Sequence, residues 1–281
     1  MLTLVAMPKP FDGHIGVIQR NAITSWTLLR PRAEIILLGN EAGVSEISAE
    51  LGLRNIAEIR RNEKSTPYLD DIFGKAQEAA TQPVVCYVNS DIVLTSDFMR
   101  AAAGAAAWRG QFLMAGRRWD IDITEPIDFC RANWEERLRD DVATRAKKRS
   151  VSWVDYFVFP RGMYQEVPPL LLGRMWWDNW LVWKARDMNV PVIDASPRVR
   201  AIHQNHGYAH PGGFFGIWQS EEGQWNERLV GGGAQARTLR DANYKFGRFG
   251  IRPNIEGAID KWWRSLRPKK KSGAATAGKT A

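Results

Sequence analysis

The sequence is poor in the features that mark several large functional classes. Its 281 residues include only two cysteines, Cys86 and Cys130, too few for a disulfide framework and typical of a reducing compartment. No stretch approaches the ~20 consecutive apolar residues of a membrane span. The motifs G-x-G-x-x-G, Walker A and G-x-S-x-G are all absent, which argues against dinucleotide oxidoreduction, P-loop phosphoryl transfer and serine hydrolysis. The apolar start of the chain meets Pro8 too early for a signal peptide, so we expect a cytoplasmic protein.

The basic character of the chain is concentrated at one end. The net charge is +8, but seven Lys and Arg residues against one acid lie in Gly257–Ala281, which leaves only +2 on the other 256 residues. A surface that follows nucleic-acid phosphates is therefore not indicated, and we expect no nucleic-acid partner. The small, polar end of this segment predicts a tail over 258–281 that is partly disordered.

The tail also carries an amphipathic pattern. Ile259, Trp262, Trp263 and Leu266 recur at helical spacing beside a run of cations. Paired tryptophans favour the headgroup region of a bilayer, and each cation near an anionic surface contributes about 1 kcal/mol. One interpretation is peripheral attachment to the cytoplasmic membrane face. The other is a solvated tail whose tryptophans pack back on the domain.

Strands and helices alternate through the first 110 residues. Continuous apolar runs predict strands, and apolar residues at helical spacing predict helices. The expected strands are Leu2–Met7, Glu34–Gly39, Ile56–Ile59 and Pro83–Val88, and the expected helices are Ile15–Leu29, Val44–Leu51, Pro67–Ala80 and Phe98–Trp108. This order predicts an α/β fold with Rossmann-like βαβ units and a mainly parallel sheet that is covered on both faces.

The pattern loosens after Gly110. The expected strands are Gln111–Gly116, Ser152–Phe159 and Val192–Asp194, and the expected helices are Asn133–Lys148 and Met175–Met188. From His203 to Gly250, glycines, histidines and aromatic residues predict loops draped over a site. The chain also has thirteen tryptophans, a residue that often provides a flat contact surface for ligands as well as core packing.

A first polar cluster follows the clearest buried strand. Asn89, Ser90 and Asp91 come directly after Pro83–Val88, and ligands of open α/β sheets bind at the carboxyl ends of strands. The Asp91 carboxylate could hold a divalent cation together with substrate phosphates. All three residue types also favour turns and helix caps, so a purely structural turn is the alternative.

A second cluster, Gly173–Trp180, combines three tryptophans with an acid at a predicted helix start. Asp178 is a candidate general base beside aromatic surfaces on which sugar rings could stack. The alternative for Asp178 is a carboxylate that only complements the helix dipole. The alternative for the tryptophans is packing in the core.

A third cluster, His203–His210, holds all but one of the four histidines. Its H-x2-H-x3-H spacing resembles a zinc site, but no cysteine or H-E-x-x-H motif supports one. An imidazole from this segment could instead join a metal that a carboxylate already binds. Otherwise these are surface histidines.

Taken in order, these segments resemble the nucleotide-diphospho-sugar transferases of GT-A fold over roughly Leu2 to Gly250. The matching segments are Val85–Ser96, similar to the D-x-D-type metal segment, Trp176–Trp180, similar to the acid-bearing helix, and His203–His210, similar to the closing loop. The resemblance implies a single catalytic domain over 1–257, with a nucleotide-binding half at 1–110 and an acceptor-side half at 111–257. Asn89 departs from the pattern, where Asp is usual, and the lost charge predicts weaker metal affinity or independence of a metal.

The resemblance also implies a reaction and residue roles. A glycosyl group would pass, with inversion, from a nucleotide-diphosphate sugar to a hydroxyl of a glycan or lipid-linked acceptor, as in polysaccharide or glycoconjugate biosynthesis. Asp91, His206 and His210 would hold a divalent cation, Mn²⁺ or Mg²⁺, and Asp178 would be the catalytic base. The other implied substrate contacts are Pro8, Lys9, Glu41, Thr66, Asp70, Asn89, Ser90, Arg174, Trp176, Trp177 and Asn179.

Two alternatives come from other classes. One is a nucleotidyltransferase that makes a nucleotide sugar, although the glycine-rich, Arg-containing loop expected after its first strand is not visible. The other is a non-catalytic carbohydrate-binding protein whose tryptophans bind sugar. A transferase requires Asp91 and Asp178 to face one cleft, although 86 residues separate them in the sequence.

Overall fold

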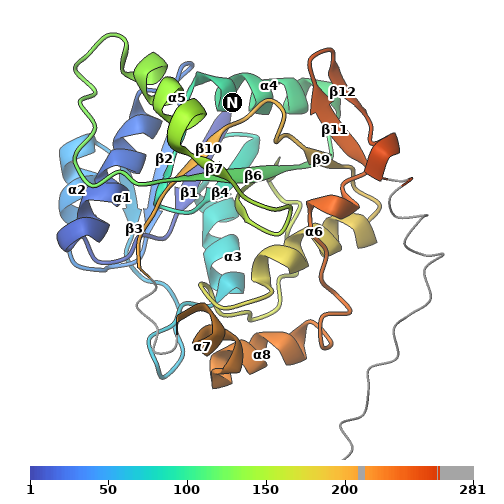
Figure 1. Cartoon of the computed structure of the whole chain (residues 1–281). Helices are drawn as coiled ribbons and strands as arrows, with labels where there is room; N and C mark the ends of the chain where they lie inside the picture. The colour runs from blue at the N-terminus through green and yellow to red at the C-terminus, as the bar shows by residue number, and fades with distance from the viewer. Residues whose placement is uncertain (208–212, 258, 260–281) are drawn as a thin grey trace, which may run out of the picture.

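One mixed sheet runs through the structure and organises everything else (Figure 1). The computed structural model describes residues 1–207, 213–257 and 259. Almost all of the predicted tail at 258–281, and the candidate ligand His210, therefore lie outside the described residues. Within the described part of the chain, no helix is both long enough and apolar enough to cross a membrane.

The strands of the first half pair in parallel, as the sequence predicts. β1 (Leu2–Ala6) lies between β2 (Glu34–Leu38) and β4 (Val84–Val88), and β3 (Arg54–Ile56) pairs with the far side of β2. β1, β2 and β4 are almost wholly buried, as expected for a parallel sheet covered on both faces. The third strand begins before the predicted Ile56–Ile59 and ends at Ile56.

The second half of the chain extends the sheet with both parallel and antiparallel strands. The strands that follow β4 across the sheet are β8 (Val154–Pro160), antiparallel to both neighbours, then β6 (Leu113–Ile121), β9 (Val192–Asp194), β11 (Tyr244–Gly247) and β12 (Gly250–Pro253). Beside this path lie the short strands β5 (Ile92–Val93), β7 (Lys147–Lys148) and β10 (Ala201–Gln204). β10 pairs with β5 and β6, and β7 pairs with β6.

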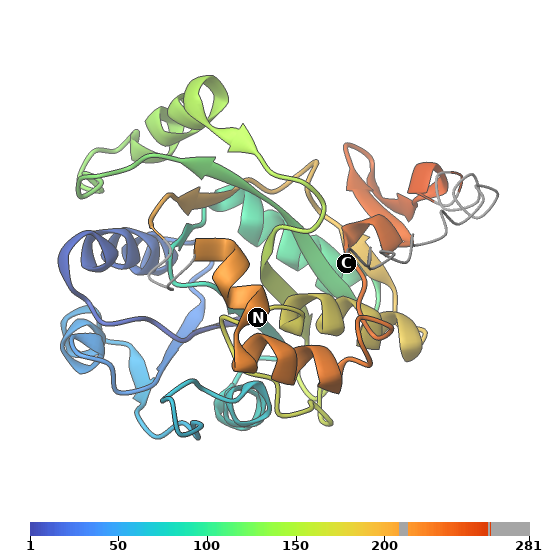
Figure 2. The ribbon, with the colours of Figure 1, turned by 60° about the horizontal axis from the view of Figure 1, so that its bottom comes forward.

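Helices cover both faces of the sheet and give three layers. The helices on one face are α1 (Gly13–Thr27), α2 (Val44–Leu51), α4 (Ser96–Trp108) and α5 (Trp134–Arg145), and those on the other are α3 (Leu69–Ala79) and α6 (Trp177–Asp187). The first set packs on strand residues such as Leu4, and we call this cluster the α1–α4 core. The second set packs on the alternate strand residues, such as Val5, and we call this cluster the α3–α6 core. α7 (Gly213–Gln219) and α8 (Glu221–Leu229) contact each other and are the orange helices at the front of Figure 2, with α8 below α7.

The segment from His203 to Gly250 is more regular than the sequence predicts. Its described part contains the end of β10, α7, α8, a short 3-10 helix at Leu239–Asp241 and the β11–β12 hairpin, and only the stretches between them, chiefly residues 230–238, are loops that reach the cavity. These elements have three to nine residues, too few for a hydrophobic period to stand out against many glycines and aromatic residues. α6 also begins at Trp177 instead of Met175, because Trp176 has a left-handed backbone conformation with a φ of 79°.

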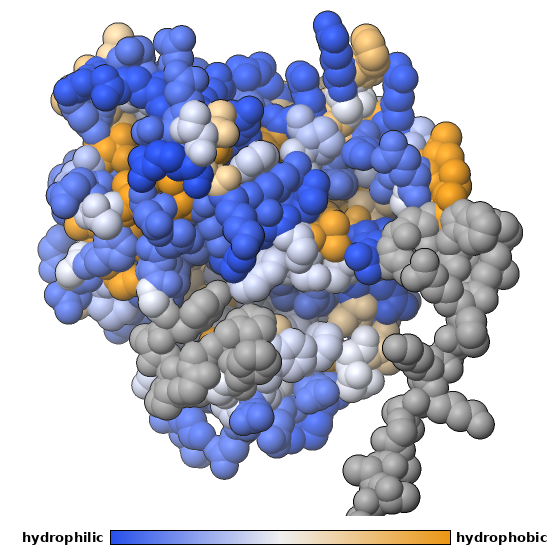
Figure 3. All heavy atoms as spheres, in the orientation of Figure 1, coloured by the Kyte–Doolittle hydropathy of each residue, from blue (hydrophilic) through white to orange (hydrophobic). Residues whose placement is uncertain are grey.

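Apolar side chains are exposed where the described chain ends. The face shown in Figure 3 is largely hydrophilic, with an apolar group at its right edge near the β11–β12 hairpin. Phe249, at the tip of this hairpin, is 74% exposed, and the guanidinium carbons of Arg248 and Arg252 lie 5.8 and 5.2 Å from its ring centroid. Ile255 and Ile259 are also exposed. The predicted amphipathic tail begins at this point of the fold.

One fully buried amide anchors α8 to the loop that leads into α6. The Nδ2 atom of Asn226 donates to the carbonyl oxygens of Leu171 and Met175, at 2.9 Å each. Its Oδ1 atom accepts from the Leu171 N–H at 2.7 Å. Asn226 therefore fixes the approach to the first turn of α6, which carries Asp178.

We predict that Asn226→Ala lowers the free energy of unfolding by about 2–4 kcal/mol, because the buried polar groups of the 171–175 loop lose their partners. Denaturant unfolding measures this change. Gln224→Ala, at an exposed position of the same helix, should change stability by less than about 0.5 kcal/mol. Equal stabilities for the two variants would contradict the anchoring role of the amide.

Candidate active site

A cavity of about 1080 Å³ lies at the carboxyl ends of β1 and β4, where open α/β sheets bind their ligands. The predicted residues that line it are Pro8, Lys9, Glu41, Thr66, Asn89, Ser90, Asp91, Arg174, Trp176, Trp177, Asp178, Asn179 and His206. Asp91 and Asp178 therefore face one cleft, as a transferase requires. Asp70 is not among the lining residues, and its carboxylate pairs with Arg60.

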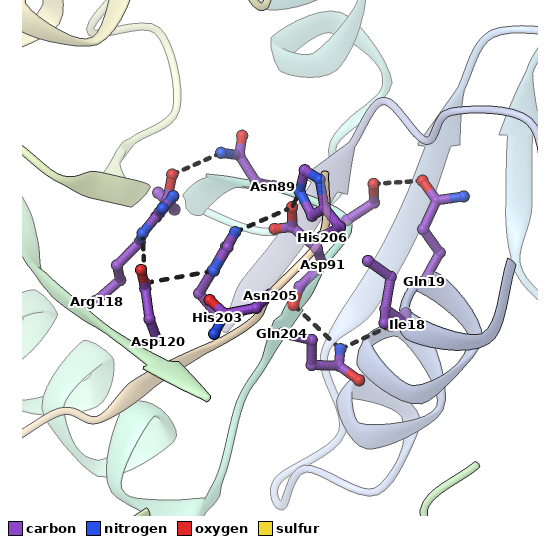
Figure 4. Close-up of polar contacts among 12 residues, drawn as sticks. Ile18, Gln19, Asn89, Asp91, Arg118, Asp120, His203, Gln204, Asn205 and His206 are labelled. Carbon is purple, nitrogen blue, oxygen red and sulfur yellow. Dashed lines mark hydrogen bonds and ion pairs between the residues drawn. The ribbon is translucent and has the colours of Figure 1, made fainter. Parts of the chain in front are cut away.

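A carboxylate and two imidazoles meet in this cavity (Figure 4). The Oδ2 atom of Asp91 lies 3.0 Å from His206 Nε2 and 3.6 Å from His203 Nε2. Its Oδ1 atom is buried and has no hydrogen-bond partner among the described residues. Burial raises the pKa of this carboxyl, but the hydrogen bond from His206 and the charges of the two histidines outweigh it and lower the pKa to about 2. Asp91 is therefore ionised at neutral pH.

The backbone at Asp91 is held by two side chains from other elements. Gln204 of β10 donates from Nε2 to the carbonyl oxygens of Asp91, at 3.1 Å, and Ile18, at 2.7 Å. The indole N–H of Trp26, which is fully buried in α1, donates to the Ile92 carbonyl at 2.9 Å. These bonds fix α1, β10 and the turn after β4 to one another, so the carboxylate projects from a rigid support.

His203 belongs to this cluster, although the sequence analysis did not select it as a ligand. It lies on β10 in register with Asp120 of β6, whose Oδ1 atom is 3.3 Å from His203 Nδ1. A carboxylate behind a ligating imidazole fixes the tautomer and orientation of the ring in metal sites. The only sequence signal was its place at the start of the histidine-rich cluster, and the loop prediction for that segment gave no reason to prefer it.

The donor set fits a divalent cation. One ligand atom each from Asp91, His203 and His206 lies within 4.8 Å of the other two, and the second oxygen of Asp91 lacks a partner within the described residues. A carboxylate with two imidazoles suits Mn²⁺ better than Mg²⁺, which prefers oxygen ligands. Asn89 lies beside this cluster, and its amide nitrogen donates to Asp155 Oδ1 at 2.8 Å.

Ser90 and Lys9 are joined through Gln19 of α1, which the sequence analysis missed. Ser90 Oγ donates to Gln19 Oε1 at 2.7 Å. Gln19 also accepts from the Lys9 backbone N–H at 2.7 Å and donates to the Lys9 carbonyl at 2.8 Å. The loops that follow β1 and β4 are thereby held together, and the charge of Lys9 contributes to the low pKa of Asp91.

Asp178 lies in the first turn of α6 and is ionised less easily than Asp91. Burial raises the pKa of its carboxyl to about 7, and the negative charge of Asp155 adds to the rise. The backbone N–H groups of Asp178 and Asn179 limit the effect. A carboxyl with a pKa near neutrality can accept and release a proton at neutral pH, as a general base must.

Arg118 supplies a buried positive charge that the sequence analysis did not identify. Its Nε atom lies 2.8 Å from Asp120 Oδ1, and its Nη1 atom lies 3.1 Å from Asp155 Oδ2. The guanidinium carbons of Arg118 and Arg149 each lie 4.5 Å from the ring centroid of Trp153. Arg118, Trp153 and Asp155 all line the cavity, so a charged aromatic wall faces its interior.

Two predicted substrate contacts are already paired within the protein. Arg174 Nη2 lies 2.7 Å from Glu222 of α8 and donates to Thr66 Oγ1 at 3.2 Å. Glu41 pairs with Arg61, which also lines the cavity. No local sequence pattern predicts these partners, because they lie 48 and 20 positions from Arg174 and Glu41.

The three tryptophans of the Gly173–Trp180 cluster have different surroundings. Trp177 and Trp180 are buried, and Trp177 packs edge-on against Tyr87 with ring centroids 5.5 Å apart. Trp176 is more exposed and meets Trp218 edge-on at 4.9 Å on the cavity wall. Core packing therefore describes Trp177 and Trp180, and Trp176 is the ring that offers most surface to a ligand.

Comparison with known proteins identifies the fold. No family model matches the chain, and no curated protein is similar to it. The structure of S. aureus TarS 1–349 in complex with UDP-GlcNAc is similar, with a TM-score of 0.50 and 12% identity over 86% of this chain and 68% of that one. The protein therefore has the GT-A fold of nucleotide-diphospho-sugar transferases, as the sequence resemblance implies.

Two further solved structures have lower scores. The Mycobacterium tuberculosis glucosyl-3-phosphoglycerate synthase in complex with Mn²⁺, uridine diphosphate and glucosyl-3-phosphoglycerate gives a TM-score of 0.47 at 12% identity, over 73% of this chain and 72% of that one. A second structure of TarS 1–349 gives 0.44 at 10% identity over 73% of this chain. In that alignment the chain spans only 57% of the length of the TarS fragment.

We predict that Asp178→Asn stabilises the protein in a pH-dependent manner. Because burial raises the pKa of Asp178 from 3.8 to about 7, its contribution to stability is complete below about pH 4 and is lost as the pH rises through about 7. The variant should match the wild type at low pH and exceed it by a few kcal/mol at about pH 8. Denaturant unfolding across this range measures the difference, and Asp140→Asn, on the exposed side of α5, is the control. A variant no more stable than the wild type at alkaline pH would show that Asp178 ionises normally.

Proposed function

We propose that the protein transfers a glycosyl group from a nucleotide-diphosphate sugar to an acceptor hydroxyl. The observation that carries the proposal is that one cavity of a GT-A fold contains both the Asp91–His203–His206 cluster and Asp178, whose pKa is about 7. The fold alone does not carry it, because one fold hosts many functions. The similar TarS structure contains UDP-GlcNAc, which supports a nucleotide-sugar donor.

In this proposal the donor lies against the first half, residues 1–110. Lys9 offsets part of the diphosphate charge, and Pro8, Thr66 and Ser90 line the space for the nucleotide. Asp91, His203 and His206 hold a divalent cation, with His210 as a further candidate outside the described residues. When bound, such a cation supplies positive charge against the departing diphosphate.

The acceptor lies against the second half, residues 111–257. Asp178 removes the proton of an acceptor hydroxyl as its oxygen forms a bond to the anomeric carbon. The bond from that carbon to the diphosphate oxygen breaks, and the electron pair leaves with the nucleoside diphosphate, so the anomeric configuration is inverted. Trp176 and Trp218 present ring surfaces on which a sugar can stack.

The residue roles predict different losses in two variants. Asp178→Asn should lower the transfer rate by about 10²–10⁴-fold and leave donor affinity nearly unchanged, because a general base acts on the acceptor. Asp91→Ala should weaken donor binding and transfer together. Calorimetry gives the donor affinity, release of nucleoside diphosphate gives the rate, and Asp140→Asn is the matched surface control. If donor affinity collapses in Asp178→Asn, the residue is a donor contact and not the base.

A panel of uridine, guanosine, cytidine and thymidine diphospho-sugars, each with and without Mn²⁺, tests the donor and the cation. The true donor at concentrations well above its dissociation constant should stabilise the protein by a few kcal/mol, as measured by thermal unfolding. The Mn²⁺-dependent part of this stabilisation should fall in His203→Ala and His206→Ala. An unchanged Mn²⁺ response in both variants would exclude the histidines as ligands.

The reaction products distinguish the alternatives from other classes. A nucleotidyltransferase would release pyrophosphate from a nucleoside triphosphate and a sugar phosphate, whereas glycosyl transfer releases a nucleoside diphosphate. A carbohydrate-binding protein would release neither, and it would keep its ligand affinity in Asp91→Ala and Asp178→Asn.

A further inference from the structure

A second charged site lies on the face of β6 that points away from the cavity. Three basic side chains meet there, and we call them the back-face cluster: Arg117, Lys148 and Arg200. Arg118 lines the cavity, whereas the next residue, Trp119, packs on the α1–α4 core on the opposite face. Lys148 of β7 is directly in register with Trp119. Ala201 of β10 is in register with Arg118, so Arg200 lies beside Arg117.

No salt bridge in the described part of the chain neutralises the positive charges of the cluster. Within the described residues, none of its three side chains forms an ion pair, and the buried Nε atom of Arg117 has no hydrogen-bond partner. Lys148 Nζ and the Arg200 guanidinium carbon lie 5.3 and 5.8 Å from the ring centroid of Trp119. The buried indole Nε1 of Trp119 also lacks a partner among the described residues. Two unused donors therefore lie among three cations.

The lowered pKa of Lys148 agrees with a concentration of positive charge at this place. Burial lowers the pKa of Lys148, and the charges of Arg117, Lys245 and Arg200 lower it further, against one opposing carboxylate, Asp194. Asp194 already accepts hydrogen bonds from Ser196. Like charges on neighbouring strands destabilise a sheet. An anion at this position would remove that repulsion and satisfy the unused donors.

We propose that the back-face cluster binds a dianionic phosphate group. The guanidinium group of Arg117 has the planar fork that matches phosphate oxygens, and Lys148 adds a compact charge with three donors. Trp119 contributes its indole N–H. The side chains of Arg117, Lys148 and Trp119 are partly exposed, so a phosphate group can enter from solvent. This site is separate from the catalytic cavity, and the proposal does not depend on the proposed function.

Thermal unfolding of the full chain tests the proposal, with sodium phosphate replacing sodium chloride at constant ionic strength. The wild type should show a saturable rise in Tm. Arg117→Gln and Lys148→Gln should each weaken phosphate binding about tenfold or more, because each removes a charge-assisted hydrogen bond. Lys147→Gln removes the same charge from the neighbouring, exposed position of β7 and should keep the response.

A second measurement separates binding from a structural role. In phosphate-free buffer, Lys148→Gln should be at least as stable as the wild type, since it removes one of three neighbouring like charges. Lower stability of this variant would mean that Lys148 is structural, and would overturn the proposal. So would a phosphate response that persists in Arg117→Gln and Lys148→Gln, or one that is lost in Lys9→Gln, which would place the anion in the catalytic cavity.

The source of the phosphate is resolved by two further probes. Glycerol 3-phosphate represents a soluble monoester, and vesicles with phosphatidic acid, compared with phosphatidylcholine alone, represent a lipid headgroup. Stabilisation by the soluble probe that is lost in Lys148→Gln assigns a free ligand. Sedimentation with the anionic vesicles alone, lost in the same variant, assigns a headgroup. If neither probe nor inorganic phosphate acts on the wild type, the cluster binds no phosphate.

Discussion

The buried guanidinium of Arg118 is the interaction on which the rest of the candidate site depends. It pairs with Asp120 at 2.8 Å and with Asp155 at 3.1 Å, and all three side chains are at most 10% exposed. Asp120 extends the network to His203, and Asp155 extends it to Asn89. Removing one partner of a buried ion pair leaves an uncompensated charge and costs about 3–5 kcal/mol. One charge therefore positions residues of β6, β8, β10 and the turn after β4 relative to one another.

A shift of register inside the sheet brings Arg118 to this place. Ala115 packs on the α3–α6 core, yet Arg118, which strict alternation would put on the opposite face, lines the cavity, and Asp120 two residues further on contacts His203. The pairing of β6 with β8 is irregular between Ala115 and Arg117. Gly116 lies at the irregularity, where a Cβ atom would come within 2.3 Å of Tyr156 Oη. Such irregularities often occur beside active sites, because they redirect side chains.

This shift of register also explains which parts of the fold and site could be predicted from the sequence. Continuous apolar runs predicted the parallel strands, and polar residues after apolar segments predicted Asp91 and Asp178, because both signals are local. The face on which Arg118 lies depends on pairing between β6 and β8, which no local pattern contains. His203 was missed for a related reason, since β10 has only four residues and is defined by its pairing with β5 and β6. The missed ion pairs, such as that of Glu222 with Arg174, join residues far apart in the chain.

Two aspartates of one cavity are given opposite proton affinities by their surroundings. Two histidines and Lys9 lower the pKa of Asp91 to about 2, against the effect of burial. Asp178 is also desolvated, but its main charged neighbour is the acid Asp155, and its pKa rises to about 7. Environments that separate the pKa values of like residues separate their chemical tasks. In the proposed function, Asp91 keeps at neutral pH the negative charge that a cation needs. Asp178 meanwhile remains able to exchange a proton, and one shared environment could not serve both tasks.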